Sequence, residues 1–243
     1  MPKSHTSRDF EAELRELRAH SLAMGARCER SVQLALDAFW SSGADAVAGS
    51  AAGGTAQTAI AEVEALDRQI DSDEMQIDAL VLRILALRQP VAYDLRFLTA
   101  ALKLVTDLER IGDEAVNIAE RAKEGHGIAK DKVQPVLKKM SEQAQQMVRD
   151  ALDAFVQGDV KTAEKVLASD DDIDKGYGEV LNTMMDFMAK NTQDIPGAVR
   201  VMKVAKYIER IADHATNIAE EVIFMVRGED VRHVRTHPPP RVS

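Results

Sequence analysis

The twelve residues ERIGDEAVNIAE (Glu109–Glu120) return one hundred positions later as ERIADHATNIAE (Glu209–Glu220). Nine of the twelve positions are identical, and these include Glu, Asp and Asn at matching places. A duplicated helical fold needs only its apolar pattern repeated, whereas here the oxygen-bearing side chains are repeated as well. The stretch therefore indicates an internal duplication and a role for polar side chains that goes beyond packing.

The duplication extends beyond this stretch. The sequence ALDAF occurs at residues 35–39 and again at 151–155, and each copy is followed by two aspartates four residues apart. These pairs are Asp67 with Asp71, and Asp170 with Asp174. A repeat period near 100 residues is too long for a solenoid unit, so it favours two related subdomains.

The composition is typical of an all-α protein, with 4% aromatic residues, 13 Gly and 7 Pro in 243 residues. Apolar residues at three- and four-residue steps predict three long helices in each half. The sequence places the helix boundaries as follows: from about Ser7 to Trp40, a second helix stopped by Pro90, a third from near Val91 to Gly125, a fourth with Asp131 as N-cap and Pro135 in its first turn, a fifth after Gly158-Asp159, and a sixth from Pro196 to Gly228.

Helices of this length cannot bury their apolar stripes alone, so each half should form an antiparallel three-helix bundle. We expect the first bundle over residues 7–126 and the second over 130–228. The Gly- and Ala-rich insertion at residues 41–58 has no apolar face and predicts a loop. The tail at 229–243, with three consecutive prolines at 238–240, is expected to be disordered.

Several classes of protein are disfavoured by the sequence. No run of 18 uncharged apolar residues predicts a membrane span, and the charged N-terminus does not read as a signal peptide. The single cysteine, Cys28, fits a reducing compartment and a packing role, so we expect a cytoplasmic protein. The net charge of −9 disfavours a nucleic-acid-binding module, which usually presents a basic face.

The repeated oxygen donors form a stripe on one side of each predicted helix. With 100° per residue and Glu109 at zero, Asp113 falls at about 40° and Asn117 at about 80°, whereas the apolar positions from Leu108 to Ala122 cluster between about 180° and 260°. The stripe therefore faces solvent or a groove. Asp67, Asp71, Glu74 and Asp78 form a similar acidic ridge on the second helix.

A solvated charged face is the simple explanation for any one ridge, but the repetition of like charges in both halves favours cation binding. Like charges four residues apart destabilise a helix by about 0.2–0.5 kcal/mol per pair. Neighbouring helices lie about 8–10 Å apart, so the two ridges of each half could converge on one cation. Carboxylate and amide oxygens without His or Cys suit Mg, Ca, Mn or iron and match structural zinc poorly.

A family resemblance appears at these residues. The segments QPVAYDLRF (residues 89–97) and AALKLVTDLERIGDEAVNIAE (100–120) resemble the PhoU family, the phosphate-specific transport system accessory proteins, as does VAKYIERIADHATNIAEEVIFMVRG (204–228). The resemblance covers about residues 8–228. It implies two three-helix bundles related by a pseudo-twofold axis, and a homodimer.

The resemblance also implies a function and partners. Such proteins are negative regulators of phosphate uptake and of phosphate-starvation signalling. They act without enzymatic activity as adaptors between a phosphate ABC transporter, at its nucleotide-binding subunit, and a membrane sensor histidine kinase, so contact with the membrane is expected only through these partners.

Some members of the family bind iron or zinc clusters through E/DxxxD motifs. By motif matching, that role carries to these residues: Asp67, Asp71, Glu109, Asp113 and Asn117 in the first half, and Asp170, Asp174, Glu209, Asp213 and Asn217 in the second. The family often has Asp-His where this chain has Asp113-Glu114, whereas Asp213-His214 keeps the pattern.

An enzyme or storage protein of the di-iron type is the alternative. Those proteins place Glu and Glu-x-x-His ligands inside a helical bundle, and no Glu-x-x-His occurs in this sequence. There is also no P-loop motif. His20 and His214 could suggest a phosphotransfer bundle, but neither has a counterpart in the other half. Met184, Met185 and Met188 are expected to fill the core, with partner docking as the second reading.

Overall fold

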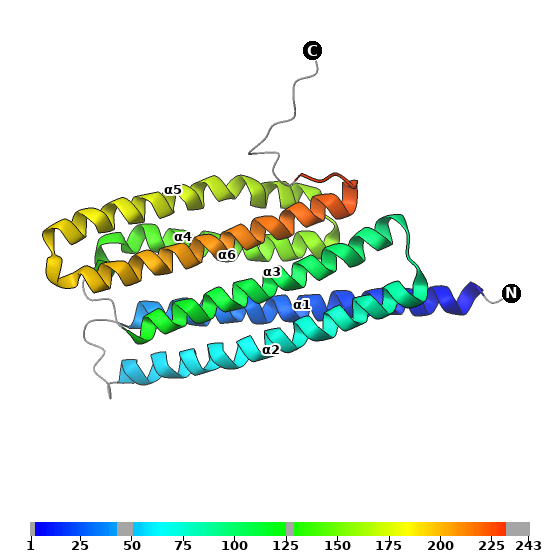
Figure 1. Cartoon of the computed structure of the whole chain (residues 1–243), viewed down its shortest axis with the longest axis horizontal. Coiled ribbons are helices and arrows are strands. Elements are labelled where there is room, and N and C mark those ends of the chain that lie inside the picture. Colours follow the sequence, from blue (N-terminus) through cyan, green and yellow to red (C-terminus); the bar gives the residue numbers. More distant parts are fainter. Residues whose placement is uncertain (1–2, 43–50, 125–128, 232–243) are drawn as a thin grey trace, which may run out of the picture.

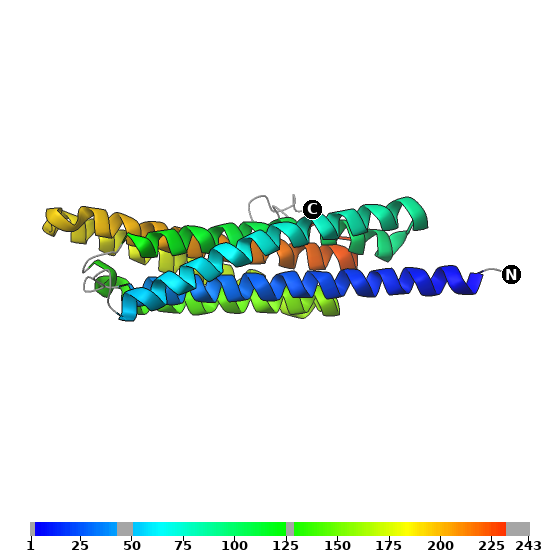
Figure 2. The ribbon, with the colours of Figure 1, turned by 90° about the horizontal axis from the view of Figure 1, so that it is seen from below.

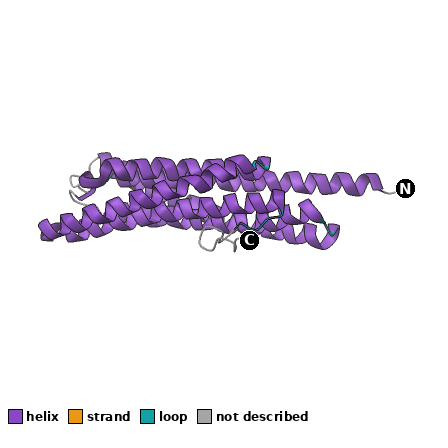
Figure 3. Ribbon diagram, turned by 90° about the horizontal axis from the view of Figure 1, so that it is seen from above, coloured by secondary structure: helices purple, strands orange, loops and turns teal. Residues whose placement is uncertain are grey.

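The computed structural model describes residues 3–42, 51–124 and 129–231 of the chain. Within these ranges the regular elements are all helical, as Figures 1 and 3 show. They are α1 (Lys3–Ser41), α2 (Ala51–Arg88), α3 (Ala92–Lys123), α4 (Ala129–Gln157), α5 (Val160–Lys190), the short 3-10 helix η1 (Thr192–Asp194) and α6 (Ile195–Arg227). Among the described helices, none combines the length and apolar content that a membrane span requires.

The helices form two antiparallel three-helix bundles, as the sequence predicts. α1, α2 and α3 pack on one another, and so do α4, α5 and α6. The bundles meet through two antiparallel contacts, α3 with α6 and α1 with α4 (Figures 1 and 2). In Figure 1 the helices α2, α3, α6 and α5 follow one another from the lower to the upper edge, with α1 and α4 on the other side of this layer.

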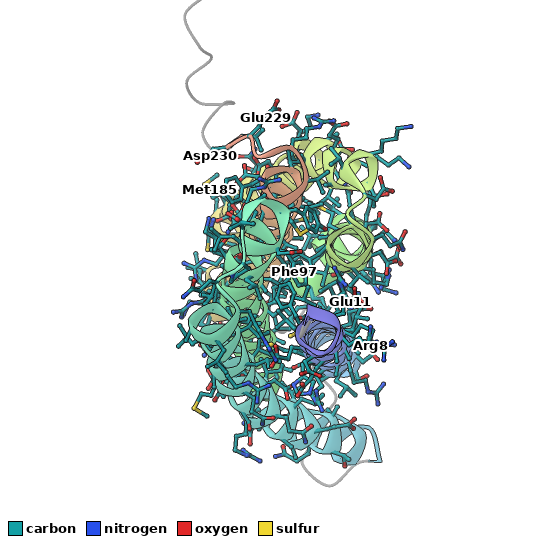
Figure 4. All side chains as sticks on the ribbon, turned by 90° about the vertical axis from the view of Figure 1, so that its right-hand side faces the viewer. Arg8, Glu11, Phe97, Met185, Glu229 and Asp230 are labelled. Atoms are coloured by element: carbon teal, nitrogen blue, oxygen red, sulfur yellow. The ribbon has the colours of Figure 1, made fainter. Side chains whose placement is uncertain are left out.

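One continuous apolar core joins the two bundles. The ring of Phe97 on α3 lies 5.6 Å from the ring of Phe155 on α4, and Figure 4 shows Phe97 in the interior between the helices. Gly25 on α1 lets Leu152 of α4 approach closely. Cys28 is fully buried, and its thiol donates to the carbonyl of Leu108 over 3.2 Å. The bundles are therefore packed together and not merely tethered.

The ends of the helices follow the local signals in the sequence. Asp159 caps α5 by accepting hydrogen bonds from the backbone amides of residues 161 and 162, directly after Gly158 in the left-handed conformation. Gly228 is left-handed at the C-terminus of α6. At the turn around Pro90, two residues other than glycine, Gln89 and Ala92, have positive φ angles of 48° and 52°.

The loop predicted over residues 41–58 is wrong over residues 51–58, which form the first two turns of α2. Residues 43–50 lie outside the described part of the chain. Glycine costs about 1 kcal/mol relative to alanine inside a helix, but packing offsets this cost. Ala56 and Ile60 are buried and hold the extension against its neighbours.

The predicted N-cap of the fourth helix is also wrong. α4 already includes Ala129, so Asp131 lies in its first turn and Pro135 lies inside the helix. Asp131 remains favourable there because an acidic side chain complements the positive end of the helix dipole. Val133 and Leu137 are buried on either side of Pro135, and this packing holds the helix together where proline removes a backbone hydrogen bond.

The three methionines of α5 divide between core and surface. Met184 is fully buried and Met188 packs against the core, as expected for core filling. Met185 is 51% exposed, and Figure 4 shows it at the edge of the molecule.

Candidate functional site

The repeated carboxylates gather in two groups. The first cluster consists of Asp67, Asp71 and Glu74 on α2 with Glu109 and Asp113 on α3. Asp67 lies against the surface of α3, since a Cβ atom placed on Gly112 would be 3.7 Å from its Oδ1 atom. Glu74 accepts a hydrogen bond of 3.4 Å from the hydroxyl of Thr106 on α3. Acidic side chains of both helices therefore lie side by side where α2 packs against α3.

Burial and mutual repulsion make the first cluster electrostatically unfavourable when it is fully ionised. Burial raises the pKa of Asp67, and the charges of Asp71 and Asp113 raise it further. Burial likewise raises the pKa of Glu109, with Asp113 as the largest repulsive neighbour. Arg110 opposes this repulsion from the exposed side of α3, 3.3 Å from both Glu109 and Asp113.

The second cluster consists of Asp170 and Asp174 on α5 with Glu209 and Asp213 on α6. Burial raises the pKa of Asp213 to about 6, and the charges of Glu209, Asp170 and Asp174 contribute to the increase. Lys206 lies in the same cluster, with its Nζ atom 2.7 Å from Oε1 of Glu209. The structure thus brings together four of the predicted residues in each half, as neighbours across two helices.

The two asparagines lie elsewhere, at the seam between the bundles where α3 packs against α6. The amide of Asn117 donates to Glu114 over 3.1 Å. The amide of Asn217 donates to Asp107 over 3.0 Å. Both asparagines are therefore separated from the groove side of the stripe. The reason is that α3 and α6 each pack against a helix of their own bundle and against each other, and the stripe of oxygen donors on each helix faces both neighbours.

The polar contacts across the seam follow an even antiparallel register. Each step along α3 is matched by an equal step back along α6 in the following pairs: Lys103 with Glu221, Asp107 with Asn217, Glu114 with Arg210, and Glu124 with Arg200. This register is centred on positions 112 and 212, which are equivalent in the duplication. A pseudo-twofold axis requires such a centre.

The structure explains why residue 114 is glutamate, where the family often has histidine. Glu114 is buried at the seam and accepts from the guanidinium of Arg210 over 3.1 Å. A histidine at this position would bring a second basic group against Arg210. The equivalent residue in the other half, His214, instead contacts Asp107 over 2.9 Å. Glu114 therefore completes the seam and does not belong to the first cluster.

The same contact bears on the phosphotransfer reading of His214. Its Nδ1 atom is engaged by Asp107, and its side chain is 21% exposed. His20 lies on α1 beside Glu16 and Arg83, in a hollow of about 330 Å³ that opens to the surface. The two histidines occupy different helices and different surroundings, so they do not form a repeated site.

The donor set of the clusters fits a hard cation. All nine side chains offer carboxylate oxygens, which Mg²⁺, Mn²⁺ and Ca²⁺ prefer. A cation would relieve the repulsion that contributes to the raised pKa values of Asp67, Glu74, Glu109 and Asp213. Across the described residues, however, no three Asp, Glu, His or Cys side chains converge as they would around a bound metal ion. Ligation would therefore require these carboxylates to rotate toward a common point.

Several residues of the site were missing from the set predicted by the sequence. Glu74 belongs to the first cluster; the sequence places it in the acidic ridge of the second helix but not among the metal ligands. Lys206 lies one turn before Glu209. Tyr177, whose ring centre is 5.4 Å from the Nζ atom of Lys206, lies one turn after Asp174. Spacing along one helix could have suggested these residues, but only packing shows which helix faces them.

Comparison with known proteins agrees with the resemblance to the PhoU family. The model of the PhoU domain matches residues 22–122 and 137–222. A "Phosphate-specific transport system accessory protein PhoU homolog" from Pseudomonas putida is 41% identical over 234 residues, covering 95% of this chain and 85% of its relative. The "Phosphate-specific transport system accessory protein PhoU" from Escherichia coli K12 is 31% identical over 230 residues, covering 95% of this chain and 90% of its relative.

Solved structures agree with this relationship. The crystal structure of PhoU from Pseudomonas aeruginosa has a TM-score of 0.80 at 36% identity, covering 90% of this chain and all of the other. The phosphate transport system regulatory protein PhoU from Streptococcus pneumoniae has a TM-score of 0.78 at 26% identity, covering 91% and 99%.

Proposed function

This chain belongs to the PhoU family, and on that premise we propose that it is a non-enzymatic regulator of a phosphate transport system. The proposed action is negative: the protein dampens phosphate uptake and phosphate-starvation signalling when phosphate is plentiful. It does so as a cytoplasmic adaptor between the nucleotide-binding subunit of the phosphate ABC transporter and a sensor histidine kinase.

The observation that carries this proposal is the match of both bundles to proteins named for the phosphate-specific transport system, over 95% of the chain. The arrangement of polar groups supports it. The repeated carboxylates lie between neighbouring helices and outside the apolar core. This placement suits recognition of a partner better than the di-iron chemistry of a bundle interior.

The regulatory role is tested by complementation. In a Pseudomonas aeruginosa strain that lacks its own PhoU, a reporter of a phosphate-starvation promoter should be active in high phosphate. Expression of this chain should restore repression to the level given by the native protein. A reporter that stays active, with the chain present in folded form at normal abundance, would refute the assignment.

The adaptor role is tested by direct binding. Purified chain should retain both the transporter's nucleotide-binding subunit and the cytoplasmic portion of the kinase in a pull-down. The unrelated nucleotide-binding subunit of a sugar transporter serves as the control. Retention of neither partner, while complementation succeeds, would leave regulation in place and remove the adaptor mechanism.

We further propose that the clusters take up metal ions, which would stiffen the acidic grooves or complete the docking surface. The ions considered are iron, zinc or a hard divalent ion of the Mg, Mn or Ca class. Elemental analysis of protein purified without chelator should show metal in the wild type and a loss in an Asp113→Ala/Asp213→Ala variant. Equal metal content in both proteins would count against these ligands.

A homodimer is proposed as the assembly in solution. Light scattering coupled to size-exclusion chromatography should give twice the chain mass of 26.7 kDa at micromolar concentration. A mass of one chain across the concentration range would contradict this proposal and leave the regulatory role untouched.

A further inference from the structure

We infer that a hollow at the seam is a docking site for an arginine side chain of a protein partner, a role that rests on the adaptor function proposed above. This seam hollow has a volume of about 340 Å³ and opens to the surface. It lies where α3 and α6 pack together, in the right-hand half of Figure 1. Its polar lining consists of Lys103, Thr106 and Asp107 from α3 with Asn217, Glu220 and Glu221 from α6.

The seam hollow is acidic and small. Asp107, Glu220 and Glu221 supply three carboxylates, against the single ammonium group of Lys103. Sites for small ligands usually measure about 300–1,000 Å³, so this volume is at the lower end of the range. The hollow therefore suits one long cationic side chain better than a large cofactor.

Glu221 has a carboxylate oxygen that lacks a donor. The residue is only 5% exposed, and its Oε1 atom accepts from the Nζ atom of Lys103 over 2.7 Å. Its Oε2 atom is buried and has no hydrogen-bond partner among the described residues. A buried charged oxygen without a donor is unfavourable. A donor that enters the hollow would stabilise this carboxylate after a small rotation of its end group.

Lys103 meets this need only in part. Its side chain is 42% exposed, and its ammonium group also lies 5.6 Å from the centre of the Phe224 ring. An ammonium group is a single point of charge, whereas a guanidinium group carries five donors in a planar fork. A guanidinium can therefore reach both Glu220 and Glu221 while Lys103 keeps its contact.

The opposite end of the seam shows how an arginine is held between two carboxylates. In the duplication, Arg121 is the counterpart of Glu221, and Glu120 is the counterpart of Glu220. The guanidinium group of Arg121 lies 3.1 Å from Glu120 and 2.7 Å from Glu124, with 19% of the side chain exposed. At that end the chain supplies its own arginine. The seam hollow has glutamate at the equivalent position, so the arginine has to come from another molecule.

Apolar surface beside the hollow favours a protein partner over a free small cation. Leu102 lines the hollow. Leu95 lies two turns earlier on the same side of α3 and is 41% exposed. Arginine surrounded by apolar contacts is typical of the residues that contribute most to binding at protein interfaces.

A peptide with a single arginine tests the hollow directly. Acetyl-Gly-Arg-Gly-amide is titrated into the ¹⁵N-labelled full-length chain at low salt, and the amide signals of Lys103 and Asn217 are followed by NMR. The wild type should show saturable shifts. Glu220→Gln/Glu221→Gln should bind about tenfold more weakly, because it removes two charge-assisted contacts. The peptide acetyl-Gly-Lys-Gly-amide should bind the wild type about threefold more weakly than the arginine peptide.

A second variant should gain affinity. Lys103→Met leaves both oxygens of Glu221 to the entering guanidinium group and should bind the arginine peptide about threefold more tightly. A variant that fails to fold could not produce this gain. Glu220→Gln alone replaces the double variant if circular dichroism shows that the double variant is unfolded.

Matched controls separate the hollow from the general charge of the chain. Asp171→Asn/Asp172→Asn removes two adjacent carboxylates from exposed positions of α5 and should leave the affinity for the arginine peptide unchanged. Lys203→Met removes the exposed counterpart of Lys103 at the opposite end of the seam and should not raise the affinity.

The outcomes separate this docking site from the adaptor role. Absence of saturable shifts in the wild type, or equal binding by the wild type and the glutamine variant, would overturn the docking site. In the pull-down described above, the glutamine variant should lose one of the two partners and keep the other. Retention of both partners would also overturn the docking site and leave the adaptor role in place, whereas retention of neither partner by the wild type would overturn the adaptor role itself.

Discussion

The guanidinium group of Arg210 on α6 donates to the carboxylate of Glu114 on α3 over 3.1 Å, across the seam between the two bundles. Glu114 is almost buried, with 9% of its side chain exposed, whereas half of Arg210 is exposed. The pair joins the halves of the duplicated chain at a position where the halves themselves have diverged. It gives the seam a charge contact that the pseudo-twofold axis does not repeat.

A double-mutant cycle should measure this contact. We expect Arg210→Ala to lower the free energy of unfolding by about 1–3 kcal/mol, because it leaves a buried carboxylate without its charged partner. Glu114→Ala should cost less, because Arg210 can return to solvent. Urea denaturation of both single variants and the double variant should give a coupling energy of at least about 0.5 kcal/mol. The exposed pair Asp172 and Lys175 is the control, and a coupling no larger than theirs would contradict the role of the seam.

Asp213 predicts a pH dependence of stability. Its pKa is raised from 3.8 to about 6 in the folded protein, first by burial and then by Glu209. Between these values the folded state binds more protons than the unfolded state, so this group's contribution to stability falls as pH rises from about 4 to about 6. At pH 7.5, in chelator-treated protein, Asp213→Asn should be more stable than the wild type by about 1 kcal/mol, after allowance for solvent screening.

The advantage of Asp213→Asn should vanish below about pH 4, where the wild-type carboxyl group is protonated as well. Urea denaturation at pH 7.5, 5 and 4 gives the comparison. Asp172→Asn, an exposed change on α5, should show no such trend. An advantage that is independent of pH would show that ionisation of the Asp213 carboxyl group is not its cause.

Pro135 predicts a stabilising substitution. It lies inside α4, is exposed, and cannot donate the backbone hydrogen bond to the carbonyl of residue 131. Pro135→Ala should raise the free energy of unfolding by about 1–3 kcal/mol, since alanine restores the donor and removes the ring clash. Pro196→Ala is the control, because Pro196 lies in the first turn of α6, where proline is tolerated. A thermal or urea midpoint that does not rise for Pro135→Ala, or that rises equally for both, would contradict the interior position of Pro135.

Gly25 and Gly178 form a matched pair for the contact between the bundles. A Cβ atom on Gly25 would lie 2.7 Å from Leu152 on α4, whereas one on Gly178 would have no atom within 4 Å. Gly178→Ala should stabilise the protein by about 1 kcal/mol through helix propensity. Gly25→Ala has the same propensity gain but forces buried Leu152 to move, and overpacking of this kind costs about 1–3 kcal/mol. Differential scanning calorimetry should show the first variant above the wild type and the second below it; equal shifts would indicate that α1 and α4 are not closely packed.

Much of the fold could be predicted from the sequence because its signals are local. Apolar periodicity predicts the long helices, and Pro90, Gly158-Asp159 and Gly228 mark ends that the structure confirms. The errors also have local causes. The Gly-rich start of α2 and Pro135 in α4 have weak helix propensity, and tertiary packing overrides it there.

The candidate site, too, could be predicted from the sequence only in part. Helical spacing by itself determined that carboxylates from paired motifs lie on one side of each helix, because rotation per residue is fixed by the backbone. Only the tertiary structure decided which neighbour each side chain meets. α3 and α6 each pack against a helix of their own bundle and a helix of the other, so one stripe is divided between groove and seam. For that reason Asp113 lies in the first cluster whereas Asn117 lies at the seam. The packing of α5 against α6 likewise brings Lys206 close to the ring of Tyr177.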